Sequence, residues 1–281
     1  MILIENTLAR LGADLRAMGV AKGDTLMVHA SLKSIGPIPG GAEALLRLFF
    51  EELGAEGTLA MPVFTYSFVG CDKSPPFDSV RSVSQTGALT EVFRKMPGTV
   101  RSFHPTHSVA VWGRSAAECI HGHSATTAFG MQSPFHKLAC QEAKVLLIGC
   151  GFTSLSLIHV GESVSRVYYR DRFCWRHRGW EPKARVALPD GGTQIVAQHE
   201  APGCSASFSR LEPLAHRAGI VAKFPLGAAT VTVVSALPLL RLIERTLAKN
   251  PDFLLCAPGA CPTCNERREE RKISPSGRSG Q

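Results

Sequence analysis

Hydrophobic and polar positions follow two periods along the chain, and the changes of period mark helices and strands. Apolar residues at helical spacing predict amphipathic helices over residues 4–18, 42–53, 86–96 and 236–249. Short apolar runs bounded by turn residues predict buried strands at residues 25–30, 58–63, 109–112 and 145–148. This alternation of strands and helices is typical of an α/β protein.

The second half of the chain has weaker patterns. The segment ARVALPDGGTQIVA (184–197) predicts a hairpin that turns at Asp190-Gly191-Gly192. The segment SFSRLEPLAHRAG (207–219) predicts a helix, and residues 227–234 predict a loop and a strand. Residues 64–84 are irregular and contain prolines, and a loop of that length is often functional.

The stretch KVLLIGCGFTSLSLIHVGESVSR (144–166) joins a buried strand to a helix through a glycine turn, with Thr153 or Ser154 as the expected N-cap. Open α/β sheets form ligand crevices at such strand ends. His159 and Glu162 are three residues apart and share a helix face, where a carboxylate can hold a histidine as a proton acceptor. An ordinary helix with one polar stripe has the same spacing, so the spacing alone leaves both interpretations open.

A loop of small residues lies between the first predicted strand and its helix. Ser31, Ser34, Gly36, Gly40 and Gly41 occur there, just before a helix N-terminus. Backbone N–H groups and the helix dipole make such a loop a candidate anion site. It matches neither the Walker pattern nor G-x-G-x-x-G, and the glycines could serve only the turns.

Four histidines precede or follow the strand at 109–112. His104 and His107 stand at its entrance, where they could contact a ligand or a neighbouring loop. Together with His121 and His123 they have no carboxylate or cysteine at a familiar ligand spacing, so a catalytic metal is not expected there.

Composition narrows the class of protein. The chain has 281 residues, of which 44% are hydrophobic, but no apolar run approaches the ~18 residues of a membrane span. The N-terminus lacks the pattern of a signal peptide, so we expect a cytoplasmic protein without a membrane partner. Nine cysteines, mostly scattered, favour reduced thiols over a disulfide framework.

The formal net charge of +8 comes partly from a basic run and a basic C-terminus. Residues 166–178 interleave arginines with aromatic residues, as nucleic-acid proteins and pockets for phosphate-bearing small molecules both do. No recognised nucleic-acid module accompanies the run, so a nucleic-acid partner is not expected. The C-terminal arginines are expected to be solvated.

Three clustered cysteines near the C-terminus have the spacing C-x4-C-x2-C: Cys256, Cys261 and Cys264. Clustered thiols in a reducing compartment suggest zinc or an iron–sulfur cluster. The set is one ligand short, and either Cys204 or His216 could complete it. A loose, redox-sensitive tail is the alternative.

Four segments in order give the chain a resemblance to the aminoglycoside 3-N-acetyltransferase (antibiotic N-acetyltransferase) family. The segments are GDTLMVHASLKSIGPIPGG (23–41), TGALTEVFRKMPGTVRSFHPTHSVAVWG (86–113), SPFHKL (133–138) and KVLLIGCGFTSLSLIHVGE (144–162). The resemblance implies an α/β mixed-sheet sandwich with helices on both faces. We therefore expect one acetyltransferase domain over residues 1–252, followed by a Cys-containing basic tail over residues 253–281.

The resemblance also implies an activity, linked to antibiotic resistance, and a set of site residues. Acetyl-CoA would be the cosubstrate and a small-molecule amine the acceptor, with His159 as general base, Glu162 as its accompanying acid and direct transfer without an acyl-enzyme on Cys150. Asp171 and Glu212 would be acceptor candidates, and a homodimer is implied. The residues expected to bind the cofactor are Ser31, Leu32, Lys33, Ser34, Gly36, His104, Pro105, Thr106, His107, Ser108, Ser133 and Phe135.

The sequence departs from this pattern in its charge. A polycationic drug needs an acidic pocket, whereas residues 166–178 after the catalytic candidate are basic. A smaller or anionic amine suits this charge better. The alternative hypothesis is a non-catalytic CoA- or nucleic-acid-binding protein that uses the basic aromatic run and the cysteine tail.

Overall fold

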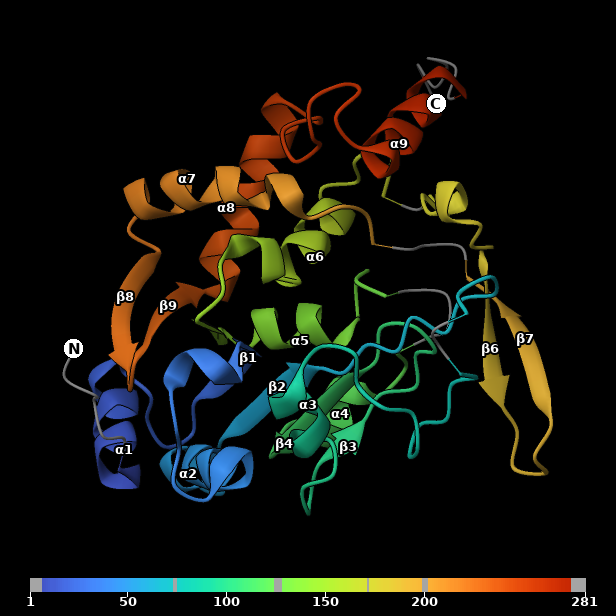
Figure 1. Ribbon diagram of the computed structural model, residues 1–281. Coiled ribbons are helices and arrows are strands. Elements are labelled where there is room, and N and C mark those ends of the chain that lie inside the picture. Colours follow the sequence, from blue (N-terminus) through green and yellow to red (C-terminus); the bar gives the residue numbers. More distant parts are fainter. Residues whose placement is uncertain (1–6, 73–74, 124–127, 171, 199–201, 274–281) are drawn as a thin grey trace.

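A computed structural model describes residues 7–72, 75–123, 128–170, 172–198 and 202–273, and its centre is a seven-stranded mixed sheet (Figure 1). The strand order across the sheet is β3-β4-β2-β1-β5-β9-β8. The strands are β1 (Thr25–Ala30), β2 (Thr58–Pro62), β3 (Val100–Arg101), β4 (Val109–Gly113), β5 (Lys144–Ile148), β8 (Val221–Leu226) and β9 (Ala229–Ser235). A separate hairpin contains β6 (Lys183–Ala187) and β7 (Thr193–Ala197).

The middle of the sheet is parallel and its two sides are antiparallel. Strand β1 pairs in parallel with β2 on one side and with β5 on the other, and Met27 faces Ala60 and Val145 in these two registers. Strands β4 and β9 pair antiparallel with the outer sides of β2 and β5. Because β1 is flanked by parallel strands on both sides, the carboxyl ends of β1, β2 and β5 meet at one edge.

Helices cover both faces of the sheet, as expected from the resemblance. One core contains side chains of α1 (Leu8–Ala17), α2 (Gly41–Leu53) and α3 (Ala88–Phe93). The other contains side chains of α4 (Ala116–Ile120), α5 (Pro134–Cys140), α6 (Leu157–Val164), α7 (Glu212–Arg217), α8 (Ala236–Lys249) and α9 (Pro262–Ile273). Alternate residues of β1 and β5 enter the two cores because successive side chains of a strand point to opposite faces. The predicted mixed α/β fold is therefore confirmed.

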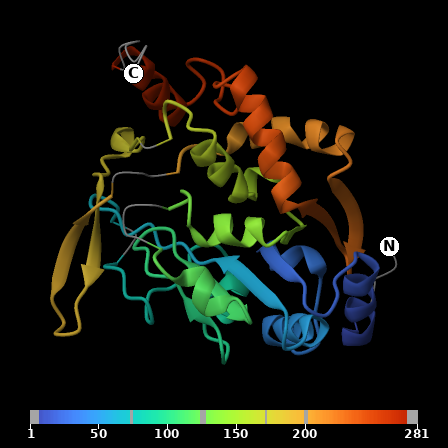
Figure 2. The same ribbon diagram turned by 180° about the vertical axis from the view of Figure 1, so that it is seen from behind.

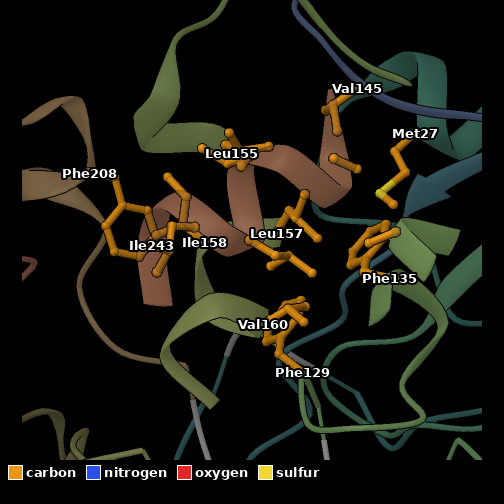
Figure 3. Close-up of a cluster of buried hydrophobic side chains, with 14 of the residues drawn as sticks. Met27, Phe129, Phe135, Val145, Leu155, Leu157, Ile158, Val160, Phe208 and Ile243 are labelled. Carbon is orange, nitrogen blue, oxygen red and sulfur yellow. The ribbon is translucent and has the colours of Figure 1, made fainter. Parts of the chain in front are cut away.

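Helix α6 lies against α8, and Figure 2 shows this pair from the opposite side. Gly161 is the point of close approach, since a Cβ atom there would lie 2.6 Å from Cγ2 of Ile243. Figure 3 shows Ile243 grouped with Ile158 and Phe208, while Phe135 lies beside Met27. The small residue lets α6 pack closely on α8, and this packing fixes the position of the α6 side chains.

Several elements differ from the prediction. The chain after β5 first forms a 3-10 turn, Phe152–Ser154, and α6 begins only at Leu157 with Ser156 as its N-cap, so the cap predicted at Thr153 or Ser154 is wrong. The edge strand β8 has mostly exposed or half-buried residues and has no strong sequence signal. The remaining 3-10 turns are Leu32–Ile35, Arg176–Arg178 and Ala206–Leu211.

The C-terminal segment packs against the rest of the chain as far as it is described. Leu254, Leu255 and Cys264 are buried in the same core as α6 and α8. Arg267 is also buried, so the expectation that the C-terminal arginines are solvated is wrong for this residue. In the ranges that the structure describes, no helix has the length and apolar character needed to cross a bilayer.

Candidate active site

A cleft of about 1290 Å³ opens at the carboxyl ends of the three parallel strands. His29 and Ser31 line it at the end of β1, Pro62 at the end of β2, and Cys150 just after β5. The first residue of the catalytic candidate pair, His159 on α6, lines the same cleft. The predicted strand–glycine–helix stretch therefore borders a cavity, as the position of the strand ends requires.

His159 and Glu162 form a hydrogen-bonded pair on α6. Nδ1 of His159 lies 2.8 Å from Oε2 of Glu162. An ionised carboxylate can only accept, so Nδ1 carries the proton and Nε2 is the basic nitrogen of the neutral ring. Phe129 and Phe208 pack against the imidazole, with ring centroids 5.4 and 4.8 Å away, which fixes its orientation.

Glu162 has a second cationic neighbour, Arg267 of α9. Nη2 of Arg267 donates to Oε2 of Glu162 over 3.0 Å, and both side chains are 3% exposed. Burial alone would raise the pKa of Glu162, but the charge of Arg267 and the hydrogen bond from His159 outweigh it and lower that pKa. The guanidinium also lies 4.1 Å from the ring centroid of Tyr169. The carboxylate therefore stays ionised in a buried site.

Two further histidines that line the cleft are buried, whereas a third, His177, is exposed. Burial lowers the pKa of His29 to about 4, and Nε2 of His29 has no hydrogen-bond partner among the described residues. Burial likewise holds the pKa of His107 well below its usual value, and Nδ1 of His107 lies 2.8 Å from Oγ1 of Thr106. Both rings are neutral near pH 7 and can exchange hydrogen bonds with a bound ligand.

Cys150 lies in the cleft wall, but its thiol is not activated. Its Sγ donates to the backbone oxygen of His29 over 3.5 Å. Burial raises the pKa of Cys150, so the thiol rather than the thiolate is the stable form near neutral pH.

A second cavity of about 420 Å³ shares Ala30, Ser31 and Gly87 with the cleft. Four residues of the loop predicted to bind the cofactor line it: Ser31, Leu32, Lys33 and Gly36. Ser34 instead donates from Oγ to the backbone oxygen of Ser31 over 2.7 Å. Gly149, with φ at +61°, presses against Ser34, and a Cβ there would lie 1.8 Å from Oγ. The loop therefore lines a groove that adjoins the cleft in which His159 lies.

The other residues predicted to bind the cofactor are buried. Of the segment 104–108, His107 lines the cleft. Oγ of Ser108 donates to the backbone oxygen of Val63 over 2.9 Å, and Nδ1 of His104 accepts from the N–H of His107 over 3.0 Å, while Nε2 of His104 has no partner among the described residues. Ser133 caps α5 by accepting from the N–H of His136, and Phe135 packs 6.0 Å from the ring of His29. Segments 104–108 and 133–135 thus lie behind the cleft wall, except at His107.

The predicted acceptor residues do not form an acidic pocket in the described ranges. Glu212 lies 3.1 Å from Nζ of Lys223 and does not line the cleft, while Asp171 lies outside the described residues. No carboxylate occurs among the described residues that line the cleft. Arg178 does line it, with its guanidinium 5.0 Å from the ring centroid of Trp175 and 5.7 Å from that of Trp180.

The C-terminal cysteines converge with a fourth thiol. Sγ atoms of Cys204, Cys256, Cys261 and Cys264 all lie within 4.8 Å of one another. His216, the other candidate for the fourth position, lies 3.8 Å from Glu212 on α7 and is not part of this group. Cys204 and Cys261 also line the cleft.

Two residues of this site are absent from the sequence-based prediction. His29 follows an apolar run within β1 and reads as a strand residue, and only its place at a strand end hints at the cleft. Arg267 belongs to a charged run, NERREERK, whose members look alike in sequence. Only the packing of α9 against α6 distinguishes Arg267 from its neighbours.

Comparisons with known proteins find similar sequences over much of the chain. A family model described as aminoglycoside 3-N-acetyltransferase matches residues 27–248. Aminoglycoside N(3)-acetyltransferase III of Pseudomonas aeruginosa is 31% identical over 183 residues, which are 60% of this chain and 68% of the relative. The SPbeta prophage-derived aminoglycoside N(3')-acetyltransferase-like protein YokD of Bacillus subtilis is 33% identical over 53% of this chain and 62% of the relative.

Solved structures extend the likeness to almost the whole chain. The aminoglycoside acetyltransferase AAC(3)-IVa in complex with gentamicin has a TM-score of 0.81 and 25% identity, and the match covers 96% of this chain and 99% of that one. The complex of AAC-IIIb with CoASH has a TM-score of 0.72 and 25% identity, and covers 87% of this chain and 97% of that one.

Proposed function

Because the chain belongs to the aminoglycoside 3-N-acetyltransferase family of acyltransferases, we propose that its cleft transfers the acetyl group of acetyl-CoA directly to the amino group of a small molecule. The observation that carries this proposal is the His159–Glu162 pair, with Nδ1 and Oε2 2.8 Å apart, at the wall of a large cleft. That pair supplies a base where the reaction needs one.

An amine attacks a thioester as the free base, and its nitrogen must give up one proton as the new carbon–nitrogen bond forms. Nε2 of His159 accepts that proton as the nitrogen attacks the carbonyl carbon, and Glu162 stabilises the imidazolium that forms. The tetrahedral intermediate then breaks its carbon–sulfur bond, and the CoA sulfur leaves with the proton from the imidazolium. The raised pKa of Cys150 favours this direct route over an acetylated cysteine.

The groove along the serine–glycine loop supports an entry path for acetyl-CoA. It joins the cleft at Ser31 and continues past Lys33 toward the start of α2 at Gly41, where backbone N–H groups and the helix dipole favour phosphates. A structural neighbour has been solved with CoASH. Near the thioester, backbone N–H groups of this loop and the unpartnered nitrogen of His29 are the available contacts for the carbonyl oxygen.

The acceptor is proposed to be an amine with less positive charge than a typical aminoglycoside. A neighbour of this fold has been solved with gentamicin, so an amino sugar is one class to test. In this chain Arg178 lines the cleft, and none of the described lining residues is a carboxylate. The positive charge of Arg178 would repel a polycation, and none of the described lining residues would offset that repulsion with a negative charge. A small or anionic amine would not be repelled in this way.

The test of the catalytic proposal is CoA release from acetyl-CoA in the presence of an amine panel. His159→Ala should lower kcat by about 10²–10⁴-fold, the usual contribution of a general base. His121→Ala, at an exposed position outside the cleft, is the matched control and should retain wild-type rates. Equal rates for wild type and His159→Ala would refute the proposal.

The same panel tests the acceptor class separately. It should contain aminoglycosides, neutral amino sugars and amines that carry a carboxylate or phosphonate, with acetylated products identified by mass spectrometry. We expect the highest kcat/KM for an amine of low or negative net charge. A clear preference for gentamicin-like polycations would contradict the acceptor proposal and leave the role of His159 intact.

A further inference from the structure

We propose that Cys204, Cys256, Cys261 and Cys264 bind one zinc ion as four thiolates, and that this ion holds α9 so that Arg267 reaches Glu162. The site itself does not depend on the proposed acetyltransferase activity. Only its consequence for Glu162 rests on that function.

The spacing of the sulfur atoms fits a single tetrahedral ion. Zinc–sulfur bonds of about 2.3 Å in a tetrahedron place neighbouring sulfurs roughly 3.8 Å apart. Sγ of Cys204 and Sγ of Cys256 are 3.7 Å apart, and all four sulfurs lie within 4.8 Å of one another. A cluster with several irons would need its thiolates farther apart, because the irons and bridging sulfides lie between them.

The surroundings of the sulfurs also suit thiolates. Backbone N–H groups of Ala206 and Cys256 point at Sγ of Cys204 and Cys264, each over 3.4 Å, and Oγ of Ser207 donates to Sγ of Cys256 over 3.4 Å. Such donors orient metal ligands and stabilise their negative charge. Arg268 donates to the backbone oxygen of Cys256. Its positive charge therefore lies beside a site where four thiolates and one zinc ion together have a net negative charge.

The ligands come from three separate segments, so the ion would tie them together. Cys204 precedes the turn that carries Phe208, and Cys256 follows α8. Cys261 immediately precedes α9, and Cys264 lies in its first turn. Helix α9 has the sequence PTCNERREERKI and few apolar side chains, so hydrophobic burial gives it little support. A helix with so little core gains its order from a metal or from polar contacts.

The position of α9 matters for the catalytic pair. Arg267 lies one helical turn after Cys264 and donates to Glu162, while Phe208 packs on His159 from the Cys204 side. Glu266 adds a second contact of α9, since its Oε1 accepts from the N–H of His177 over 2.8 Å. The ion would therefore act on catalysis by positioning α9, and with it Arg267.

The first experiment measures metal content in untagged, full-length protein purified under reducing conditions. Elemental analysis should find one zinc per chain in the wild type, and Cys261→Ser should lose most of it. Cys140→Ser is the matched control, because Cys140 is exposed on α5 and should leave the zinc content unchanged. Iron in place of zinc, or equal zinc in the Cys261→Ser protein, would overturn the proposal.

A second measurement keeps the test decisive if Cys261→Ser fails to fold. Removal of the metal from wild-type protein by a chelator should lower the Tm, and added zinc should restore it. Added cobalt(II) should give the metal-free protein the visible absorption of a tetrahedral thiolate site. A metal-free wild type that neither binds cobalt nor changes its Tm would overturn the proposal, as would a Cys204–Cys256 disulfide in the isolated protein. None of these results requires turnover, so they can be distinguished from a failure of the proposed function.

Discussion

Glu162 is a buried carboxylate that accepts hydrogen bonds from His159 on one side and from Arg267 on the other. Burial alone would raise the pKa of Glu162, but the positive charge of Arg267 and the contact with His159 lower it. The carboxylate therefore stays ionised and holds Nδ1–H of His159, which leaves Nε2 free to act as a base.

Arg267→Gln should therefore shift the acid limb of the pH–rate profile. Loss of the buried positive charge raises the pKa of Glu162, because burial then acts against a weaker opposing charge, and the acid limb of kcat/KM should move to higher pH. Activity should recover at high pH, which a merely misfolded protein would not show. The measurement is kcat/KM from pH 5 to 9.

The control for this variant is Arg245→Gln on the exposed side of α8, which should have a wild-type profile. Arg267→Gln should also be less stable, because a buried carboxylate that loses its partner costs about 3–5 kcal/mol. A uniform loss of activity at every pH would show that Arg267 serves stability alone.

Cys150 offers a test of direct transfer. Its thiol lies in the cleft, but burial raises its pKa and it donates to the backbone oxygen of His29. Cys150→Ala should keep most of the wild-type kcat, because no acetyl group passes through the sulfur. Mass spectrometry of the wild type mixed with acetyl-CoA alone should show no acetylated enzyme. An acetyl adduct on Cys150, with loss of turnover in Cys150→Ala, would require a two-step route.

At the scale of elements, the contact between α6 and α8 decides where His159 and Glu162 stand. Gly161 lies between these two residues in the sequence and faces Ile243 of α8. Gly161→Ala would place Cβ 2.6 Å from Ile243 and should destabilise the protein by about 1–3 kcal/mol, the usual cost of overpacking. The free energy of unfolding in urea measures this loss.

A double variant separates the contact from a general effect of the alanine. Ile243→Ala in the Gly161→Ala background should cost less than Ile243→Ala alone, because Ile243→Ala removes Cγ2 and Cδ1, the two atoms nearest the added Cβ. Gly151→Ala is the control, since no atom lies within 4 Å of the added Cβ and φ there is −116°. Additive costs in the double variant would mean that Gly161 does not set the distance between the helices.

Elements with strong local patterns could be predicted from the sequence, and those that depend on partners could not. Strand β1 and helix α8 have the predicted bounds, because β1 is a short apolar run that follows a turn and α8 keeps apolar residues at helical spacing throughout. Strand β8 was missed because its outer position in the sheet leaves most of its residues exposed or half-buried. The start of α6 was predicted too early, since a 3-10 turn precedes the helix and its N-cap residue, Ser156, makes no capping hydrogen bond through its side chain.

The candidate site shows the same division. The spacing of His159 and Glu162 is local, so a helix of any kind brings them together. Arg267 is more than a hundred positions away from Glu162, and Cys204 is 52 positions away from Cys256. Such contacts arise only when the chain folds, and no spacing rule within one segment can show them.

At the scale of the whole molecule, the parallel centre of the sheet explains why buried histidines surround the cleft. His29 ends the central strand, while His104 and His107 come just before β4, which pairs with β2. The pKa of His29 is lowered to about 4 by burial, and burial also holds those of the other two well below their usual value. All three rings are therefore neutral in the folded protein at pH values where the unfolded chain is protonated.

This difference makes the fold sensitive to acid. A histidine whose pKa is lower in the folded state than in the unfolded chain makes its full contribution to stability at a pH above the pKa of the unfolded chain. That contribution is lost as the pH falls from about 6.5, the pKa in the unfolded chain, toward the pKa in the folded state. For His29 the window runs from about 6.5 down to about 4, and the loss should reach about 2 kcal/mol by pH 5. Urea denaturation at pH 7.5, 6 and 5 would measure it.

His29→Asn isolates the contribution of this histidine, because acid release of a metal or protonation of other groups would affect wild type and variant alike. The stability of the variant should fall less steeply between pH 6.5 and 5 than that of the wild type. His121→Gln, at an exposed position, should keep the wild-type slope. Parallel slopes for wild type and His29→Asn would mean that His29 takes up a proton in the fold as easily as in the unfolded chain, and that its ring is not held neutral at the cleft.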